Sequence, residues 1–201
     1  MRKRILVTSS LLVMGTSAMA LDVQGFLGVG AGISLNKIQG EGKANYSSGE
    51  TEKANFSETE SSALAGIKGG VILGDSHRLA LNYNPAFHSN ATIHNILASY
   101  DYLIPVPAND RVKLFVGVHA GVAKFDGKDD LSGIDATGFA YGAQFGYVYD
   151  ITKNIEFEFG VMYTKHTADK EFSGKESWGS YKEKYELKHS ISTLVGINYK
   201  F

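Results

Sequence analysis

The chain has 201 residues, with 20 lysines and arginines against 21 acidic residues and no cysteine. The formal net charge of −1 argues against a nucleic-acid partner, which requires a concentrated basic surface. The lack of cysteine argues against disulfides and against a cysteine-linked lipid anchor. Glycine is abundant, with 23 residues, and 11 tyrosines and 11 phenylalanines stand against three prolines and one tryptophan. This composition is typical of strands and turns, and the length predicts one domain.

Residues 1–20 have the pattern of an export signal. Three bases open the segment, a mostly apolar run continues to residue 14, and Ala-Met-Ala ends it with the small-x-small pattern that a signal peptidase cleaves. The apolar run is too short to cross a bilayer as a helix. We therefore expect cleavage after Ala20 and a mature domain of residues 21–201, in which 17 bases and 21 acids give a net charge of −4.

Apolar residues recur at every second position along most of the remaining chain. Successive side chains of a strand point to opposite faces, so this period predicts strands with one apolar face and one small, mixed or charged face. Eight segments follow the pattern: 22–37, 62–73, 78–88, 93–104, 111–124, 137–149, 155–167 and 185–201.

The connections between these segments alternate in length. The short ones are 74–77, 105–110 and 150–154, and the long ones are 38–61, 125–136 and 168–184, with a brief exception at 89–92. The alternation predicts an up-and-down meander with short turns at one end and longer loops at the other.

A meander of this kind can close with its apolar face inward, as in a soluble barrel, or outward, toward lipid. Tyr100, Tyr102 and Tyr199 gather at one end of their segments, as in the aromatic girdle of a membrane barrel. Segments of about 11–13 residues match tilted membrane strands, and the alternate face is rich in glycine, which suits a narrow interior. The sequence therefore predicts an all-β fold, a transmembrane antiparallel up-and-down β-barrel of eight strands with short periplasmic turns and longer extracellular loops.

The last segment alternates up to its final residue, with four residues on one face: Val195, Ile197, Tyr199 and Phe201. A closed barrel must pair its last strand with its first, because lipid offers no water to an open edge. The ending "GINYKF" and the glycine-rich start "VQGFLGVGAGISL" resemble the small eight-stranded outer-membrane β-barrel family that includes opacity-type proteins. The resemblance implies a bacterial outer-membrane location, and it implies that the four residues form a signal for the barrel-assembly machinery.

Charged residues lie on the face opposite the apolar one, which would line the lumen: Lys68, Arg78, Asp101, Lys113, Glu156, Glu158 and Lys200. Most of them lie near the short turns, so we expect a cluster at the periplasmic end. Charges removed from bulk water must pair or remain hydrated. We interpret them as a salt-bridged filling of the lumen, and the alternative is a gate whose pairs rearrange to admit small solutes.

Catalysis is not predicted. Some small barrels that hydrolyse lipid A carry a His-x-Ser-Asn motif, but His88 and Ser89 are adjacent here and would face opposite ways on a strand. The sequence nominates no acid to orient the histidine. The six histidines lack metal-ligand spacing. We expect no enzyme activity, no cofactor and no metal.

The segments 39–61 and 168–184 are rich in charged and small polar residues. They are expected to be solvated surface loops or recognition loops, with Trp178 and Tyr181 as candidate contacts because exposed aromatic residues often anchor interfaces. We hypothesise a monomeric barrel with a structural or adhesive role. Its expected partners are outer-membrane lipid and lipopolysaccharide, the assembly machinery, and a host or cell-surface ligand. The alternatives are a narrow porin-like channel for small solutes or hydrophobic molecules, and an enzyme that modifies lipid A in the outer leaflet.

Overall fold

The computed structural model describes residues 22–89, 91–128, 135–176 and 179–201, and every regular element in them is a strand. Over these ranges the protein has no helix long and apolar enough to cross a membrane. The predicted export signal lies outside the described residues. The strands are β1 (Val23–Tyr46), β2 (Thr51–Leu73), β3 (His77–Phe87), β4 (Ala91–Val106), β5 (Asn109–Gly127), β6 (Asp135–Asp150), β7 (Ile155–His166), β8 (Asp169–Glu176) and β9 (Gly179–Lys200).

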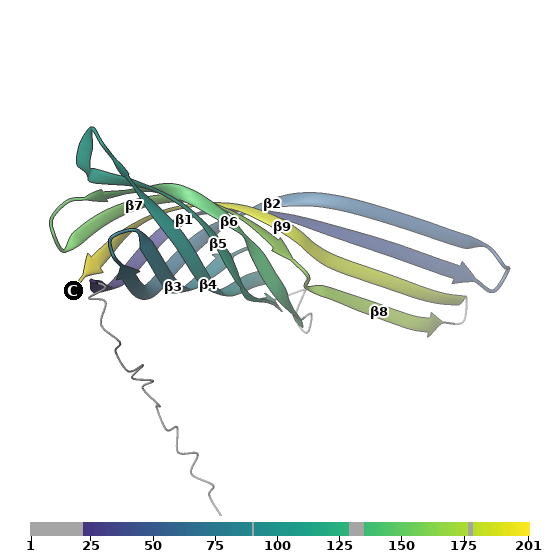
Figure 1. Cartoon of the computed structure of the whole chain (residues 1–201). Coiled ribbons are helices and arrows are strands. Elements are labelled where there is room, and N and C mark those ends of the chain that lie inside the picture. The colour runs from purple at the N-terminus through teal and green to yellow at the C-terminus, as the bar shows by residue number, and fades with distance from the viewer. Residues whose placement is uncertain (1–21, 90, 129–134, 177–178) are drawn as a thin grey trace, which may run out of the picture.

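Eight of these strands form a closed ring (Figure 1). Antiparallel ladders join β1 to β7 in chain order, β7 pairs with β9, and β9 pairs back with β1. Strand β8 pairs with β9 only beyond the end of the β7 ladder, so it lies outside the ring. The prediction of an eight-stranded antiparallel up-and-down barrel is confirmed.

The apolar face of the wall points outward, as the membrane interpretation requires. Large apolar side chains are exposed all around the ring, including Leu27 at 60%, Val29 at 63% and Phe145 at 60% of their surface. A soluble protein would bury such residues. The inner face instead holds buried polar and charged groups together with small apolar clusters, one of which comprises Phe26, Ile72, Leu103, Phe115 and Val148.

The short connections lie at the end of the barrel where β1 begins and β9 ends. In the turn between β2 and β3, Gly74 and Asp75 both adopt the left-handed conformation, with φ of 55° and 60°, which lets the chain reverse in a few residues. Phe201 exchanges two backbone hydrogen bonds with Gly25, of 2.9 and 3.1 Å. The wall is therefore closed by hydrogen bonds at this end.

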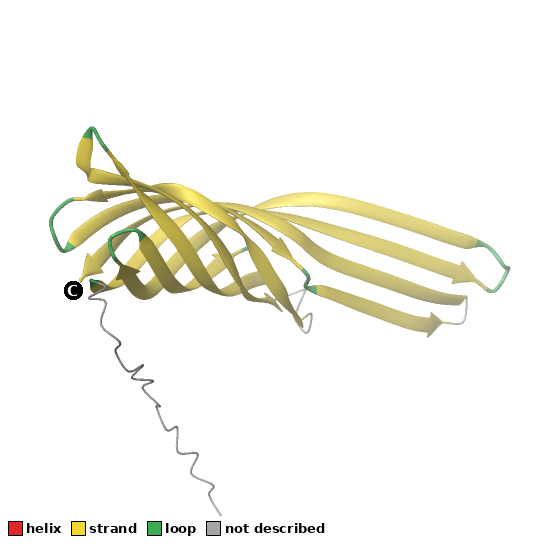
Figure 2. Ribbon diagram, in the orientation of Figure 1, coloured by secondary structure: helices red, strands yellow, loops and turns green. Residues whose placement is uncertain are grey.

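The prediction of loops at 38–61 and 168–184 is wrong, because the structure continues both segments as strands. Figure 2 shows that four strands, β1, β2, β8 and β9, run well beyond the rest of the barrel. The β1–β2 ladder continues to Asn45↔Thr51, and the β1–β9 ladder continues to Tyr46↔Gly179. We call this four-stranded extension the arm, formed by residues 38–46, 51–60, 169–176 and 179–187, with strand order β2-β1-β9-β8.

Glycine and aromatic residues explain how this polar sequence forms strands. A Cβ atom on Gly40 would lie 2.0 Å from the Phe56 ring, and one on Gly174 would lie 2.6 Å from the Tyr181 ring. The rings thus cover bare backbone, an arrangement that compensates for glycine in strands. The predicted loop at 125–136 is also partly strand, since Phe125 pairs with Ala136, and residues 129–134 lie outside the described part of the chain.

Candidate functional site

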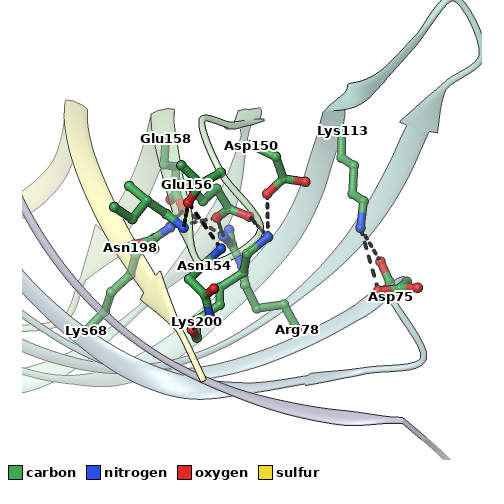
Figure 3. Close-up of polar contacts among 12 residues, drawn as sticks. Lys68, Asp75, Arg78, Lys113, Asp150, Asn154, Glu156, Glu158, Asn198 and Lys200 are labelled. Carbon is green, nitrogen blue, oxygen red and sulfur yellow. Dashed lines mark hydrogen bonds and ion pairs between the residues drawn. The ribbon is translucent and has the colours of Figure 1, made fainter.

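Arg78 is the centre of an ion-pair cluster in the periplasmic half of the lumen (Figure 3). Strands β3 and β4 place Arg78 directly opposite Asp101, and its Nε and Nη2 each lie 3.0 Å from Asp101 Oδ2. Its Nη1 lies 2.6 Å from Glu158 Oε2 and 3.8 Å from Glu156 Oε1. The guanidinium also lies over the Phe115 ring, 4.8 Å from the centroid. The planar guanidinium group has several hydrogen-bond donors, so one arginine can bind several carboxylates at once.

Two lysines complete the cluster. Lys68 on β2 pairs with Glu158, and Lys200 on β9 pairs with Asp150 and lies 3.7 Å from Glu156. Three cations therefore meet four carboxylates, and all of these side chains except that of Asp150 are at most 13% exposed. Charges so far from water are tolerated only when they are paired and hydrogen-bonded.

Lys113 is the one predicted lumen charge that the structure keeps apart from this cluster. Its Nζ lies 3.4 Å from the backbone oxygen and 3.9 Å from the carboxylate of Asp75, in the β2–β3 turn. Figure 3 shows this pair separated from the others. Lys113 lies near the start of β5, at the rim, where water reaches it.

Three polar members of the network were not predicted from the sequence. Asn198 donates hydrogen bonds of 2.8 and 2.9 Å to Glu156 and Glu158, and Gln144 donates one of 2.6 Å to Asp101. Asp150 was assigned to a turn but ends β6. The inward period of two could have identified Asn198 and Gln144, because each alternates with residues already assigned to the lumen.

A second, uncharged polar layer lies between the cluster and the mouth. His119 contacts Gln144 and Thr164 at 3.1 and 3.0 Å, which links this layer to Asp101. Near the mouth, Asn36 is bonded to Ser62 and Ser190. The described residues hold no group of histidines and carboxylates able to bind a metal ion.

The lumen has little free space at the level of the cluster. The cavity beside Lys68, Arg78 and Glu158 has a volume of about 40 Å³. That is room for a few water molecules at most. A wide aqueous path is therefore absent from this part of the described structure.

A larger groove opens at the mouth, where the arm joins the barrel. One cavity of about 220 Å³ is lined by Ile38, Phe56, Phe125, Tyr185, Leu187 and the carboxylate-bearing Glu58 and Glu60, among others. A neighbouring cavity of about 400 Å³ shares part of this lining and adds His88 and Ser89. The Phe56 and Tyr185 rings lie 5.8 Å apart between centroids. We call the two cavities together the mouth groove.

His88 and Ser89 do not form a nucleophile–base pair in the described structure. His88 Nδ1 lies 3.3 Å from Glu60, and its Nε2 lies 3.3 Å from the Asn36 amide nitrogen. Both ring nitrogens are therefore engaged by groups that are not nucleophiles. Burial lowers the pKa of His88, and the nearby Glu60 carboxylate opposes this shift.

The two predicted loop contacts have different outcomes. Tyr181 lies on β9 within the arm, half-buried against Gly174, so it is not at a loop tip. Trp178 lies outside the described residues. Tyr181 faces the same cavity of the arm as Lys43, Glu52 and Glu183.

Comparison with known proteins places this geometry in a family. The model of the outer membrane protein beta-barrel domain matches residues 8–201. No curated protein matches the chain. Three solved structures with a similar fold are each less than 25% identical to this chain, so the similarity concerns the fold alone.

Neisserial surface protein A is 18% identical, with 84% of this chain and 97% of that chain covered and a TM-score of 0.54. OprG from Pseudomonas aeruginosa is 14% identical over 88% of this chain and 95% of its own, with a TM-score of 0.57. OprH from P. aeruginosa is 24% identical over 85% of this chain and 99% of its own, with a TM-score of 0.50.

Proposed function

The chain belongs to the outer membrane protein beta-barrel domain family, and on this premise we propose that it is a non-conducting barrel that holds a recognition surface above the membrane. It is a protein of the bacterial outer membrane, in a family that is mostly non-enzymatic. The observation that carries the proposal is the position of the arm and the mouth groove on top of a lumen filled by ion pairs.

The arm suits recognition because it is a regular hydrogen-bonded sheet where loops were expected. It inherits its direction from the barrel wall, since β1, β2 and β9 run through both, with one register shift between β1 and β9 at Lys37/Ile38. Binding residues on regular elements are held more firmly than those on loops. Tyr181 lies on this sheet, and Trp178 remains a second candidate contact.

The charge of the mouth groove predicts the chemistry of its ligand. Apart from His88 beside Glu60, no described basic side chain lies within ion-pair distance of Glu58 or Glu60. Both carboxylates border an apolar lining that includes Phe56 and Leu187. A ligand that combines an apolar group with a positive charge would contact the apolar lining and pair with the carboxylates.

The recognition role can be tested on intact cells. A surrogate Gram-negative cell displaying the protein would be incubated with an array of matrix proteins and cell-surface glycans. We expect binding that is lost when residues 41–55 are replaced by a short turn, or when Trp178→Ala and Tyr181→Ala are combined. Heat-modified mobility on gels would verify that the variants fold. Absence of binding by the wild type, or equal binding by the folded variants, would contradict the proposal.

A narrow channel is the second candidate, favoured by the polar layer of His119 and Gln144 that continues from Asp101 toward the mouth. Conductance of the refolded protein in a planar bilayer separates the two functions. We expect silence from protein whose circular dichroism is strand-rich. Reproducible current steps that change in Glu158→Gln would favour the channel. Altered lipid A in cells that overexpress the protein would instead reveal the third possibility, a lipid A-modifying enzyme.

A further inference from the structure

The outer wall carries a row of basic residues at the extracellular edge of its apolar belt. On three adjacent strands the outward apolar run ends at Leu35, Ile191 and Tyr163, which are 46%, 46% and 47% exposed. These three residues are paired in register, Leu35↔Ile191 on β1 and β9 and Tyr163↔Ile191 on β7 and β9. They mark one level of the wall, where contact with acyl chains ends.

The next outward residue on each of these strands is basic. Two positions further toward the arm lie Lys37, His189 and Lys165, again paired in register as Lys37↔His189 and Lys165↔His189. The Tyr163 ring packs against His189, with 5.6 Å between centroids. The ladders therefore align three nitrogen-bearing side chains side by side, a short distance above the lipid-facing belt.

This basic row has no acidic partner among the residues that the structure describes. No described carboxylate lies within ion-pair distance of Lys37, Lys165 or His189. Glu186 lies on the neighbouring part of β9 but is held by Lys184 at 2.6 Å and by Lys188. Hydrogen bonds from Lys184 and Lys188 keep the pKa of Glu186 below its usual value, which is the behaviour of a carboxylate whose charge is already compensated.

The opposite sector of the rim shows the contrasting arrangement. There, His94 and Lys124 are also register partners, on β4 and β5. Asp126 lies 2.9 Å from Lys124 and 3.6 Å from His94. Within the described part of the chain, basic residues at the rim are therefore paired with an acidic residue in one sector and have no such partner in the other.

We propose that Lys37, His189 and Lys165 form a binding site for the phosphate groups of lipopolysaccharide in the outer leaflet. Ammonium groups bind phosphate oxygens by charge-assisted hydrogen bonds, and basic clusters beside a membrane attract anionic headgroups. The acyl chains of the same lipid would lie against Leu35, Ile191 and Tyr163. The site thus matches both parts of one amphiphile, an anionic headgroup above and apolar chains below.

The site would anchor the barrel at a fixed height and rotation beside its annular lipid. It lies on β1, β9 and β7, and two of these strands continue directly into the arm. A bound headgroup would therefore support the base of the arm from the outside, a role separate from ligand recognition in the mouth groove.

The test uses the refolded full-length mature barrel and three probes: bisphosphorylated lipid A, the same lipid after enzymatic dephosphorylation, and inorganic phosphate. Retention of lipid is measured by native mass spectrometry, and thermal unfolding by heat-modified gel mobility. We expect the bisphosphorylated lipid alone to be retained and to raise the unfolding temperature. The variant Lys37→Gln/Lys165→Gln should bind it roughly tenfold to thirtyfold more weakly, since each base near a membrane surface contributes about 1 kcal/mol.

The controls separate binding from folding. Lys124→Gln removes a rim cation that Asp126 already neutralises and should leave retention unchanged, whereas Lys37→Arg/Lys165→Arg should restore it. Circular dichroism verifies that each variant is folded. Equal retention of dephosphorylated lipid A, an equal effect of inorganic phosphate alone, or equal losses in Lys124→Gln would each overturn the proposal.

Discussion

The lumen and the arm share strands β1, β2 and β9, yet their charged residues are arranged in opposite ways. In the lumen, Arg78 and Asp101 have side chains only 3% and 2% exposed, and each has several partners. On the outer face of the arm, Lys182 and Glu171 form a single cross-strand pair with side chains 57% and 47% exposed. Pairs of the first kind are costly to break, whereas pairs of the second kind contribute little. The free energy of unfolding of the barrel therefore depends on the ion pairs of the lumen. The exposed ion pairs of the arm contribute little to it.

The largest expected effect comes from Arg78→Leu. The change leaves Asp101 and Glu158 buried without their main cation, and loss of one member of a buried ion pair costs about 3–5 kcal/mol. Urea unfolding of the refolded barrel, followed by circular dichroism, measures the loss. Lys182→Gln is the matched control on the arm and should not shift the midpoint. If both variants unfolded at the same urea concentration, the contrast between lumen and arm would fail.

Gly28→Ala should have the next largest effect. A Cβ atom there would lie 2.1 Å from Asn198 Oδ1, so Asn198 must move away from Glu156 and Glu158. Overpacking of this kind costs about 1–3 kcal/mol. In the arm, Gly42→Ala is the control, because its nearest neighbour would be 3.7 Å away. Equal stability of the two variants in urea would show that Asn198 has more room than its contacts suggest.

Phe56→Ala should loosen the arm and spare the barrel. The substitution uncovers Gly40 and removes the ring contact with Tyr185. Amide exchange in residues 38–42 and 54–58 should quicken by roughly fivefold to tenfold, the equivalent of about 1 kcal/mol for an aromatic pair. The thermal midpoint of the barrel should not change. Unaltered exchange would mean that backbone pairing alone maintains the arm.

The smallest effect should be a pH dependence at the mouth. Burial lowers the pKa of His88, so the folded protein binds a proton there less readily than the unfolded chain, whose histidine has a pKa of about 6.5. Local stability is therefore present above that pH and is lost as the pH falls through the lower, folded value. Hydrogen exchange of residues 86–88 at pH 7.5 and pH 5 should show faster opening in acid. The variant His88→Gln should lack the difference.

Period-two alternation was sufficient to predict the ring, because lipid outside and a narrow lumen inside force each residue to one face. Phe145 and Gln144, for instance, fall on the faces that their chemistry requires. The same logic identified Arg78, Asp101, Glu156 and Glu158 as lumen residues, although pairing partners depend on ladder register, which composition does not reveal. Lys113 illustrates this, since its partner Asp75 lies in the β2–β3 turn, which does not neighbour β5 in the sheet.

The arm could not be predicted for a different reason. Above the membrane neither face of the sheet meets lipid, so the apolar signal disappears although the backbone ladders continue. Residues 51–61 are exposed on both faces of the sheet, so their sequence pattern predicts a loop. The signal that remained was the small-residue pattern of Gly40, Gly42 and Ala44. Its meaning depends on the pairing of β1 with β2, which places Gly40 opposite Phe56.

The longest ladder after β1–β2 joins the two strands that are furthest apart along the chain. It extends from Phe26↔Lys200 to Tyr46↔Gly179, so β1 keeps one unpaired edge until β9 has been synthesised and delivered. Ring closure is therefore a late event in biogenesis, and a chain cut anywhere before β9 presents an exposed strand edge. Such an edge can pair with another chain, so an unfinished barrel is prone to aggregation. The arm contains part of the same β1–β9 ladder. It can therefore form completely only after β9 has paired with β1 and closed the ring.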